Sequence, residues 1–385
     1  MLALRLAALS AALPLALTLS GVPQSTSTVR VSRFNVGNLT AVNELHTLVA
    51  PILPGHDTFT FPMYSFLVEH RTHKLLFDIG ARKDPENLAP GLAALFASGA
   101  FVGPSDTDIF DVLRGAGIPV ESIESVIWSH AHFDHIGDMS KFPSSTSLVI
   151  GAETDISTFP TNPNGTLLES DFAGRRVTKI DFAASNLTFN DLKAFDYFGD
   201  GSFYLVDTPG HIPGHLTALA RVTPSPKPTF LLLAGDTFHH PGEARPRPAF
   251  QKSFPCPAHL LASANAHIST DFFFSSGSHN GAFDMHTRAS SLLSISDTAD
   301  SFTTDPVLAT VSLEKIARWD ADDDVLVLIA HDISVVSNHT GSGGLGGLPY
   351  HPQTLNGWKK AGWKEETVWN FVDVDGPAWV FSPTV

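Results

Sequence analysis

The chain has 385 residues, of which 43% are hydrophobic, so it is long enough to bury a substantial core. Its 39 acidic residues outnumber 24 basic residues, and the formal net charge of −15 argues against nucleic acid or an anionic membrane as a partner. The lone cysteine, Cys256, excludes an intrachain disulfide and a metal cluster held by thiolates. Eighteen histidines beside four tyrosines indicate metal chemistry instead.

The first 22 residues predict a secretory signal peptide. Arg5 precedes an apolar run over residues 6–19, which Pro14 interrupts and which is too short to cross a membrane. Four N-glycosylation sequons agree with export, at Asn38, Asn164, Asn186 and Asn338. We therefore expect a secreted glycoprotein. Residues 23–385 contain no repeat and no long linker, which favours a single domain with a C-terminal extension and leaves the oligomeric state open.

The rest of the chain predicts many short strands and a few helices. Apolar or alternating runs predict strands at residues 25–32, 59–70, 74–77, 147–150, 176–182, 187–195, 203–207, 217–221, 229–233 and 325–330. Helices are expected at residues 38–49, at 105–116 with Ser105 as N-cap, and at 307–319. The turn-rich residues 155–174 are expected to form an exposed excursion, and the proline-rich stretch 241–257 is expected to lie at the surface. The tail that contains Trp358, Trp363 and Trp369 is expected to pack onto the body.

The stretch that begins at Val126 carries the strongest chemical signal. After an apolar run it delivers His130, His132, Asp134 and His135 within six residues. Side chains two apart on an extended segment point to the same face, so His130 and His132 are expected to bind one metal ion. Asp134 and His135 follow where the chain turns, and we expect them to reach a second ion. Imidazole and carboxylate groups suit a borderline ion such as zinc.

Other predicted strands also end in potential metal ligands. The strand 203–207 runs into two Pro-Gly-His units, which place His211 and His215 in a loop. Asp236 follows the strand 229–233, and His331 follows the strand 325–330. Strands that deliver side chains at their ends onto one rim assemble an active site from distant parts of a sequence. Helices between such strands favour an α/β fold with two sheets between helical layers.

In this order the motifs resemble those of the metallo-β-lactamase superfamily. The resemblance spans residues 60–335 and rests on the segment from Leu75 to Gly80, the motif from His130 to His135, the loop that ends at His211, Asp236, and the pair His331-Asp332. It implies an αββα sandwich, in which two mixed β-sheets pack face to face with helices on the outside. It also implies an enzyme, namely a dinuclear metal-dependent hydrolase.

The resemblance implies a complete ligand set for two divalent ions, with zinc favoured and manganese or iron as alternatives. One ion would be bound by His130, His132 and His211. The other would be bound by Asp134, His135 and His331. Asp236 would bridge both ions together with a water or hydroxide, which would act as the nucleophile. Asp134 would also carry a proton to the leaving group.

Neighbouring residues are expected to support this set. By the family pattern His211 is the ligand, and His215 supports a ligand or is purely structural. Asp78 is expected to order the end of a strand and to support a ligand histidine. Asp138 and Asp332 are candidates for accepting the outer N–H group of a ligand histidine, with solvation as the alternative.

The ligand set is most similar to that of N-acyl homoserine lactonases, and also to that of organophosphate hydrolases in the same superfamily. In the lactonase pattern a tyrosine lies three residues after the bridging aspartate. Here His239 stands at that position and is expected to donate the same hydrogen bond to the substrate carbonyl. We expect a small-molecule ester substrate, with lactones favoured. The alternatives are phosphotriester or thioester hydrolysis and, in another class, a non-catalytic binding module stabilised by metal.

Overall fold

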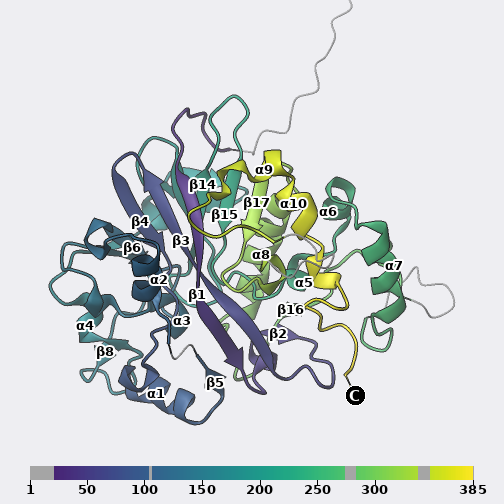
Figure 1. Ribbon diagram of the computed structural model, residues 1–385, viewed down its shortest axis with the longest axis horizontal. Helices are drawn as coiled ribbons and strands as arrows, with labels where there is room; N and C mark the ends of the chain where they lie inside the picture. The colour runs from purple at the N-terminus through teal and green to yellow at the C-terminus, as the bar shows by residue number, and fades with distance from the viewer. Residues whose placement is uncertain (1–20, 104–105, 274–282, 337–346, 385) are drawn as a thin grey trace, which may run out of the picture.

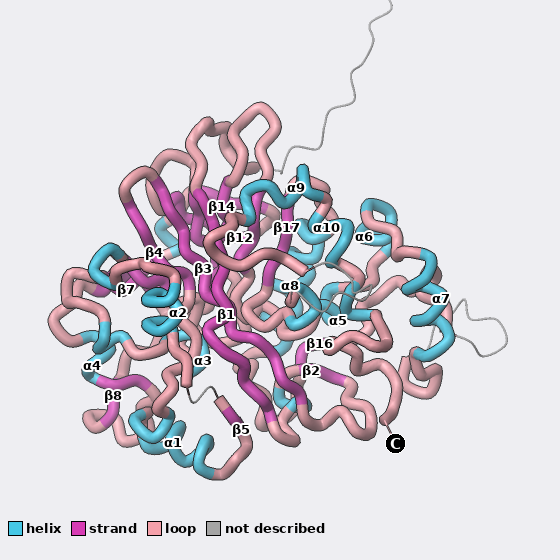
Figure 2. The backbone as a smooth tube through the Cα atoms, in the orientation of Figure 1, coloured by secondary structure: helices cyan, strands magenta, loops and turns pink. Residues whose placement is uncertain are grey.

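A computed structural model describes residues 21–103, 106–273, 283–336 and 347–384. Residues 1–20 of the expected signal peptide, Ser105 and Asn338 lie outside these ranges. Within them the chain forms two large sheets with helices around them (Figure 1). In Figure 2 the long strands run through the middle of the molecule, and the helices lie mostly towards its periphery.

Both sheets combine parallel and antiparallel neighbours. The first sheet has the order β10-β7-β6-β4-β3-β1-β5, and the second has the order β11-β12-β13-β14-β15-β17. The strands of the first sheet are β1 (Arg30–Ala41), β3 (Phe59–His70), β4 (His73–Phe77), β5 (Phe101–Val102), β6 (Ser125–Ile127), β7 (Ser147–Gly151) and β10 (Val177–Ile180). Those of the second are β11 (Leu187–Phe189), β12 (Leu192–Asp196), β13 (Phe203–Asp207), β14 (Leu216–Arg221), β15 (Phe230–Leu233) and β17 (Val325–Leu328). Two small pairs join β2 (Val49–Ala50) to β16 (Ser294–Ile295) and β8 (Thr158–Phe159) to β9 (Leu167–Leu168).

The two sheets pack face to face because their strands alternate side chains between two buried layers. On β3, Phe66 and Val68 belong to the core between the sheets, whereas Leu67 faces the opposite layer. On β13, Leu205 points into the same central core and Tyr204 points away from it. The outer layer of the first sheet is covered by α2 (Ile109–Gly115), and that of the second by α8 (Pro306–Asp320). This arrangement is the expected αββα sandwich.

The other helices are short and lie in the connections and the C-terminal tail. They are α1 (Pro90–Ala97), α3 (Phe133–Ile136), α4 (Glu169–Phe172), α5 (Pro241–Ala244), α6 (Pro248–Ser253), α7 (Ala258–His267), α9 (Trp358–Ala361) and α10 (Trp363–Thr367). Single 3-10 turns lie at Leu45–Thr47, Pro85–Asn87, Val120–Ser122, Met139–Lys141, Phe182–Ala184, Ile333–Val335, Leu355–Gly357 and Asn370–Val372. In the described part of the chain, no helix has the length and apolar character that a membrane crossing requires.

The proline-rich stretch 241–257 was expected to lie at the surface, and this expectation was wrong for its first part: residues 241–246 are buried, whereas residues 248–249, 252–253 and 255 are exposed. It contains α5 and α6, which both begin with proline, because a missing N–H group costs no hydrogen bond at the first position of a helix. All four residues of α5 are buried. Phe250 of α6 packs against Trp369 of the tail in a large apolar cluster. This contact confirms that the tail packs onto the body.

Two other expectations were also wrong. Residues 38–49 do not form an α-helix, because β1 continues to Ala41 and pairs with β3 and only the 3-10 turn Leu45–Thr47 follows it. Residues 187–195 are a hairpin of β11 and β12 rather than one strand. The turn contains Asn190 and Asp191 with φ angles of 48° and 62°, which these two residue types tolerate better than most. The stretch 155–174 is mostly exposed or half-buried, as expected, and contains β8, β9 and α4.

The strands that precede the candidate ligands end at one edge of the sandwich. In the first sheet β4 and β6 are parallel neighbours, so the residues that follow them meet at the same edge. In the second sheet β13 and β15 both run antiparallel to β14, and β17 is parallel to β15. Two backbone hydrogen bonds join the sheets at this edge, from Leu216 N to Ser129 O (2.8 Å) and from Tyr64 N to Ala330 O (3.0 Å).

Candidate metal centre

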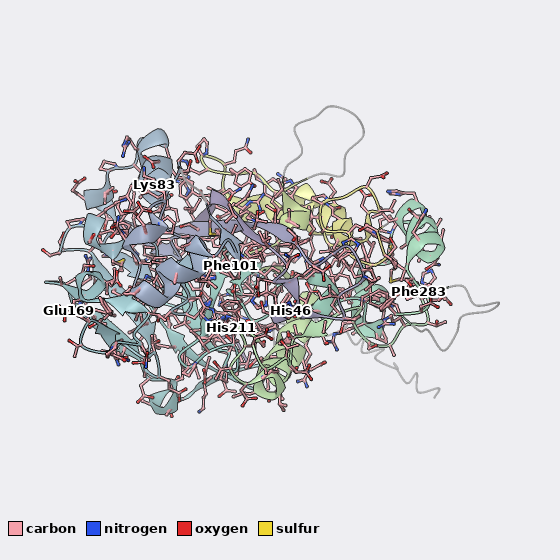
Figure 3. All side chains as sticks on the ribbon, turned by 90° about the horizontal axis from the view of Figure 1, so that it is seen from below. His46, Lys83, Phe101, Glu169, His211 and Phe283 are labelled. Atoms are coloured by element: carbon pink, nitrogen blue, oxygen red, sulfur yellow. The ribbon has the colours of Figure 1, made fainter. Side chains whose placement is uncertain are left out.

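Short loops after four strands bring the seven candidate ligands together near the middle of the molecule, where Figure 3 labels His211. His130 and His132 follow β6, and His132 is the N-cap of α3, whose single turn contains Asp134 and His135. His211, Asp236 and His331 follow β13, β15 and β17. Gly235 has a φ angle of 51°, and an added Cβ would lie 2.9 Å from Ser129 Cβ. Glycine is therefore needed where the chain turns Asp236 into the site.

One ligand group contains His130, His132 and His211 together with Asp236. His130 Nε2 lies 3.0 Å from His132 Nδ1 and 3.2 Å from His211 Nε2. His132 Nδ1 and His211 Nε2 are 3.0 Å apart. Two nitrogen atoms bound to one tetrahedral zinc ion are about 3.3 Å apart, so the triangle has nearly the size of a metal site. Asp236 Oδ2 lies 3.7 Å from both His130 Nε2 and His211 Nε2.

The second ligand group contains Asp134, His135 and His331 and shares Asp236 with the first. His135 Nε2 lies 3.2 Å from Asp236 Oδ2, and His331 Nε2 lies 3.3 Å from Asp236 Oδ1. His331 Nε2 is also 3.3 Å from Asp134 Oδ2. The carboxylate of Asp236 thus lies between the two groups.

The donor set fits divalent cations. Asp236 Oδ1 and His331 Nε2 are buried, and neither has a hydrogen-bond partner among the described residues. In the first group three imidazoles direct nitrogen atoms at one point, which is unfavourable for buried lone pairs unless a cation accepts them. Imidazole nitrogens and carboxylate oxygens are the ligands that zinc and other first-row divalent ions accept. The residues therefore fit a pair of such ions.

The electrostatic environment differs between the two groups. Burial and the neighbouring imidazoles lower the pKa of His130 and of His211, and burial lowers the pKa of His132 to about 4. Burial also opposes protonation in the second group, but there Asp236 and Asp134 raise the pKa of His331 to about 10. The first group thus offers neutral imidazoles, and the second attracts positive charge.

Neighbouring groups hold the outer ring nitrogens of the candidate ligands. His135 Nδ1–H donates to Asp78 Oδ2 at 2.9 Å, and Asp78 Oδ1 accepts the Ser129 N–H group at 2.7 Å. Asp78 therefore orders the strand end, as expected, and orients the ring of the candidate ligand His135. Two comparable contacts join His331 Nδ1 to Pro62 O (2.9 Å) and His211 Nδ1 to Thr303 Oγ1 (3.3 Å). Such contacts orient the opposite ring nitrogen towards the metal position.

The remaining supporting residues have more local contacts. His215 Nε2 accepts the Asp236 N–H group at 3.1 Å, and its Nδ1–H group donates to Thr208 O at 2.9 Å. Both ring nitrogens of His215 are therefore occupied, so it supports Asp236 and is not a ligand. Asp138 and Asp332 are buried rather than solvated, and each caps the 3-10 turn that follows it. Neither carboxylate is hydrogen-bonded to a ligand histidine in the described structure.

His239 lies at the edge of the site. Its Nε2 atom is 3.3 Å from Asp236 Oδ2, and its ring lies parallel to that of His331 at a centroid distance of 6.3 Å. Its Nδ1 atom is buried and has no hydrogen-bond partner among the described residues. The ring is thus placed to contact a substrate that binds beside Asp236.

Two apolar cavities adjoin the ligand groups. One is lined by Phe61, Phe101, Phe133 and Phe302 next to the candidate ligands. The other shares Phe61, His239 and His331 with the first and reaches Val380 in the tail. No lysine or arginine is among the described residues that line either cavity. Apart from the candidate ligands and the neighbouring histidines, the described cavity walls are therefore apolar.

Sequence reasoning missed Glu243 and the cavity residues Phe61, Phe101 and Phe302. Glu243 is fully buried, and its Oε2 atom accepts the N–H groups of both His239 and His240 at 2.7 Å. The run His240-Pro-Gly-Glu243 is a helix-start pattern that could have located this residue. The cavity phenylalanines have no such local signal, because they come from distant segments.

Comparison with known proteins agrees with this arrangement. Residues 60–331 match the model of the metallo-beta-lactamase superfamily. The chain belongs to this superfamily. The matched range runs from β3 to His331 and so includes all seven candidate ligands.

Relatives and solved structures support the same conclusion. The chain is 37% identical over 371 residues to the metallo-hydrolase mfmC of Annulohypoxylon moriforme, which covers 93% of this chain and 90% of the relative. It is 32% identical over 373 residues to the gamma-lactamase FDB1 of Fusarium pseudograminearum, covering 91% and 83%. The structure of a quorum-quenching N-acyl homoserine lactone hydrolase has the same fold, with a TM-score of 0.52 and 14% identity over 86% of this chain and 100% of that one. This superfamily member is a hydrolytic enzyme.

Proposed function

We propose that this protein is a dinuclear metal-dependent hydrolase that opens a small cyclic ester. The observation that carries the proposal is the pair of ligand groups that share Asp236 beside two apolar cavities. Zinc is the proposed ion because imidazole-rich sites with carboxylates suit it, with manganese and iron as alternatives. The proposed ligands are His130, His132 and His211 for one ion, Asp134, His135 and His331 for the other, and Asp236 for both.

Ions bound at the two groups would supply a water molecule of lowered pKa and would polarise the substrate carbonyl. The chain's own residues would direct the proton transfers. Asp134 lines the first cavity with its side chain 10% exposed, so Oδ2 would take up a proton and pass it to the leaving oxygen. His239 would donate a hydrogen bond from Nε2 to the carbonyl oxygen as negative charge develops there.

The cavities favour an uncharged, apolar substrate. The rings of Phe61, Phe101 and Phe302 would exclude water from the reacting bond, and this strengthens every electrostatic interaction inside the site. A lactone meets these conditions because its ester group carries no charge until the ring opens. A thioester or phosphotriester that bears acidic groups would find no lysine or arginine among the described cavity residues.

A γ-lactam is the second candidate, and the 32% identity with the gamma-lactamase FDB1 favours it. The nitrogen of an amide leaves only after it gains a proton, whereas the oxygen of an ester leaves more easily. Asp134 and His239 are the groups that could deliver this proton. His239→Ala should therefore slow lactam opening more than lactone opening.

The test begins with metal content, measured by mass spectrometry on protein purified without chelator. The same sample is assayed with γ-butyrolactone, an N-acyl homoserine lactone, 2-pyrrolidinone, a simple thioester and a phosphotriester. We expect about two metal equivalents and fastest turnover of a lactone. Preference for 2-pyrrolidinone would move the assignment to the γ-lactam. A metal content below about one equivalent after incubation with zinc, manganese or iron would contradict the metal centre and favour a binding module.

We also propose that the protein is exported. The apolar run over residues 6–19 and the exposed sequon residues Asn38, Asn164 and Asn186 support this proposal. Expression in a secreting eukaryotic host should release a mature chain that begins near residue 23 and loses mass on glycosidase treatment. Retention inside the cell with an intact first residue would contradict export.

A further inference from the structure

Glu243 is the third residue of α5 and is fully buried beside the metal centre. Its Oε2 atom accepts two hydrogen bonds of 2.7 Å, from the backbone N–H groups of His239 and His240. A single oxygen atom thus fixes the chain at the residue whose ring borders both cavities. Glu243 Oε2 thus binds the backbone of His239, while the His239 side chain faces Asp236.

The other oxygen of Glu243 and the outer nitrogen of His239 are both unsatisfied. Glu243 Oε1 and His239 Nδ1 are buried, and neither has a hydrogen-bond partner among the described residues. Burial raises the pKa of Glu243 to about 7, and the charge of His239 is the strongest neighbouring influence in the opposite direction. A hydrogen bond from Nδ1–H to Oε1 would satisfy both atoms. Because a neutral imidazole has only one N–H group, simultaneous donation from Nε2 to the substrate requires the doubly protonated ring, which a Glu243 carboxylate would stabilise. A neutral residue would cap α5 equally well, so a buried carboxylate at this position calls for a further role.

His240 anchors the same turn on its other side. Its Nδ1 atom accepts the Gly242 N–H group at 2.9 Å, so its proton lies on Nε2 and is donated to Ala378 O at 2.8 Å. The turn is therefore tied to the C-terminal tail, which also contributes Val380 to the second cavity. Both ring nitrogens of His240 are therefore hydrogen-bonded, whereas His239 Nδ1 remains available to bind Glu243.

We infer that Glu243 is a positioning residue that holds His239 against the scissile carbonyl, through Oε2 to the backbone and through Oε1 to the ring. The inference rests on the proposed function, because that function assigns His239 its contact with the substrate. Glu243 touches neither the substrate nor the proposed ions. Its effect on the reaction passes through His239.

The test is a double-mutant cycle. Glu243→Ala is measured alone and in a His239→Ala background, with kcat, KM and metal content determined for each protein. We expect Glu243→Ala alone to lower kcat about 10- to 100-fold with little change in KM, because a displaced catalytic group costs up to about 10²-fold. In the His239→Ala background the same substitution should cause no further loss. Glu243→Gln keeps an oxygen for both N–H groups and should restore part of the activity.

A readout independent of turnover separates this inference from the proposed function. Long-range ¹H–¹⁵N NMR spectra report the two ring nitrogens of each histidine, and the His239 signals are those absent from His239→Ala. Glu243→Ala should shift these signals even if the enzyme prefers a lactam or another substrate. Loss of lactone turnover in the wild-type protein would therefore refute the proposed substrate without affecting this test.

Asp171 provides a matched control. It is also a buried acid at the third position of a four-residue helix, α4, where it accepts the Leu168 N–H group at 2.8 Å. Figure 3 shows that Glu169, the first residue of α4, lies far from His211. Asp171→Ala should lower the thermal midpoint, as loss of a cap does, but leave the His239 signals and kcat unchanged.

Several outcomes would overturn the inference. An equal loss of kcat in both backgrounds would mean that Glu243 acts independently of His239. Unchanged His239 signals in Glu243→Ala would mean that it does not orient the ring. If Glu243→Ala fails to fold, Glu243→Asp replaces it, because the shorter side chain keeps the charge but draws the carboxylate away from both N–H groups. An Asp variant with wild-type kcat and unshifted His239 signals would refute the inference equally.

Discussion

The two ligand groups are built from similar residues but depend on different physical effects. The first consists of three imidazoles whose pKa values burial lowers, and the outer nitrogen of His211 meets only the neutral Thr303. The second contains Asp134, has the negatively charged Asp78 behind His135, and holds His331 between two carboxylates. The comparison teaches that geometry organises the first group and negative charge organises the second. Asp236 belongs to both.

Loss of the Asp236 carboxylate, which both groups share, should disable the two ligand groups together. Asp236→Ala leaves both groups without a common ligand and leaves five imidazoles, four of them buried, without its charge. We expect kcat/KM to fall on the order of 10³-fold or more, because loss of a single stabilising donor in an active site already costs about 10²–10³-fold. Metal content and turnover are measured together on protein whose circular dichroism matches the wild type. Retained activity would exclude the proposed centre.

A ligand that belongs to one group only should affect that group first. His132→Ala and His331→Ala remove one unshared ligand from the first and second groups respectively. Each variant should keep about one of two metal equivalents, and each should lose most activity, because a two-metal site needs both ions to act on one water. Equilibrium dialysis with zinc measures the equivalents. Loss of both ions in either variant would show that the two groups do not bind independently.

Asp78, the charged partner of His135, should strongly affect metal affinity at the second group although it is not itself a proposed ligand. Asp78→Asn keeps the shape of the side chain but removes the charge that faces His135 Nδ1 at 2.9 Å. We expect metal affinity at the second group to fall about 10- to 100-fold, the usual effect of removing such a partner. Competition with a chromophoric chelator gives the affinity of each site. A loss of metal affinity at the first group alone would contradict the assignment of Asp78 to the second group.

The neutral partner of the first group should have the smallest effect. Thr303→Val removes the hydroxyl group 3.3 Å from His211 Nδ1 while keeping the branched shape of a side chain that is 4% exposed. A neutral hydrogen bond contributes about 0.5–1.5 kcal/mol, so metal affinity should fall about 2- to 10-fold. The same chelator assay is used, with Asp78→Asn as the matched variant. A larger loss than that of Asp78→Asn would contradict the distinction between geometry and charge.

Much of the fold could be predicted because its signals are local. The strands β3 and β4 lie where apolar alternation and a short turn predicted them. The helix α8 lies where apolar residues that recur every three to four positions predicted a helix. Proline was misleading in the stretch 241–257, because it begins helices as well as breaking them. The hairpin turn at Asn190 and Asp191 was missed because the apolar run continues on both sides of it.

The candidate site shows the same division. Spacing along the chain predicted His130, His132, Asp134 and His135 as candidate ligands, because ligand type and alternation are properties of one short segment. It did not predict a role for Glu243, because that role depends on the tertiary contact between Glu243 and His239. It also did not identify the cavity that joins Phe61 to Phe101 and Phe302, since each ring comes from a different part of the fold.

The sequence by itself determined which side chains have the chemistry of metal ligands and which predicted strands they follow. Only the tertiary structure decided that Asp236 lies between two groups of different charge and that His239 rests on Glu243. The physical reason is that ligand chemistry belongs to residues, whereas distance, burial and the charge felt by a buried group belong to packing. That packing brings β6, three strand ends of the second sheet and the C-terminal tail to one place.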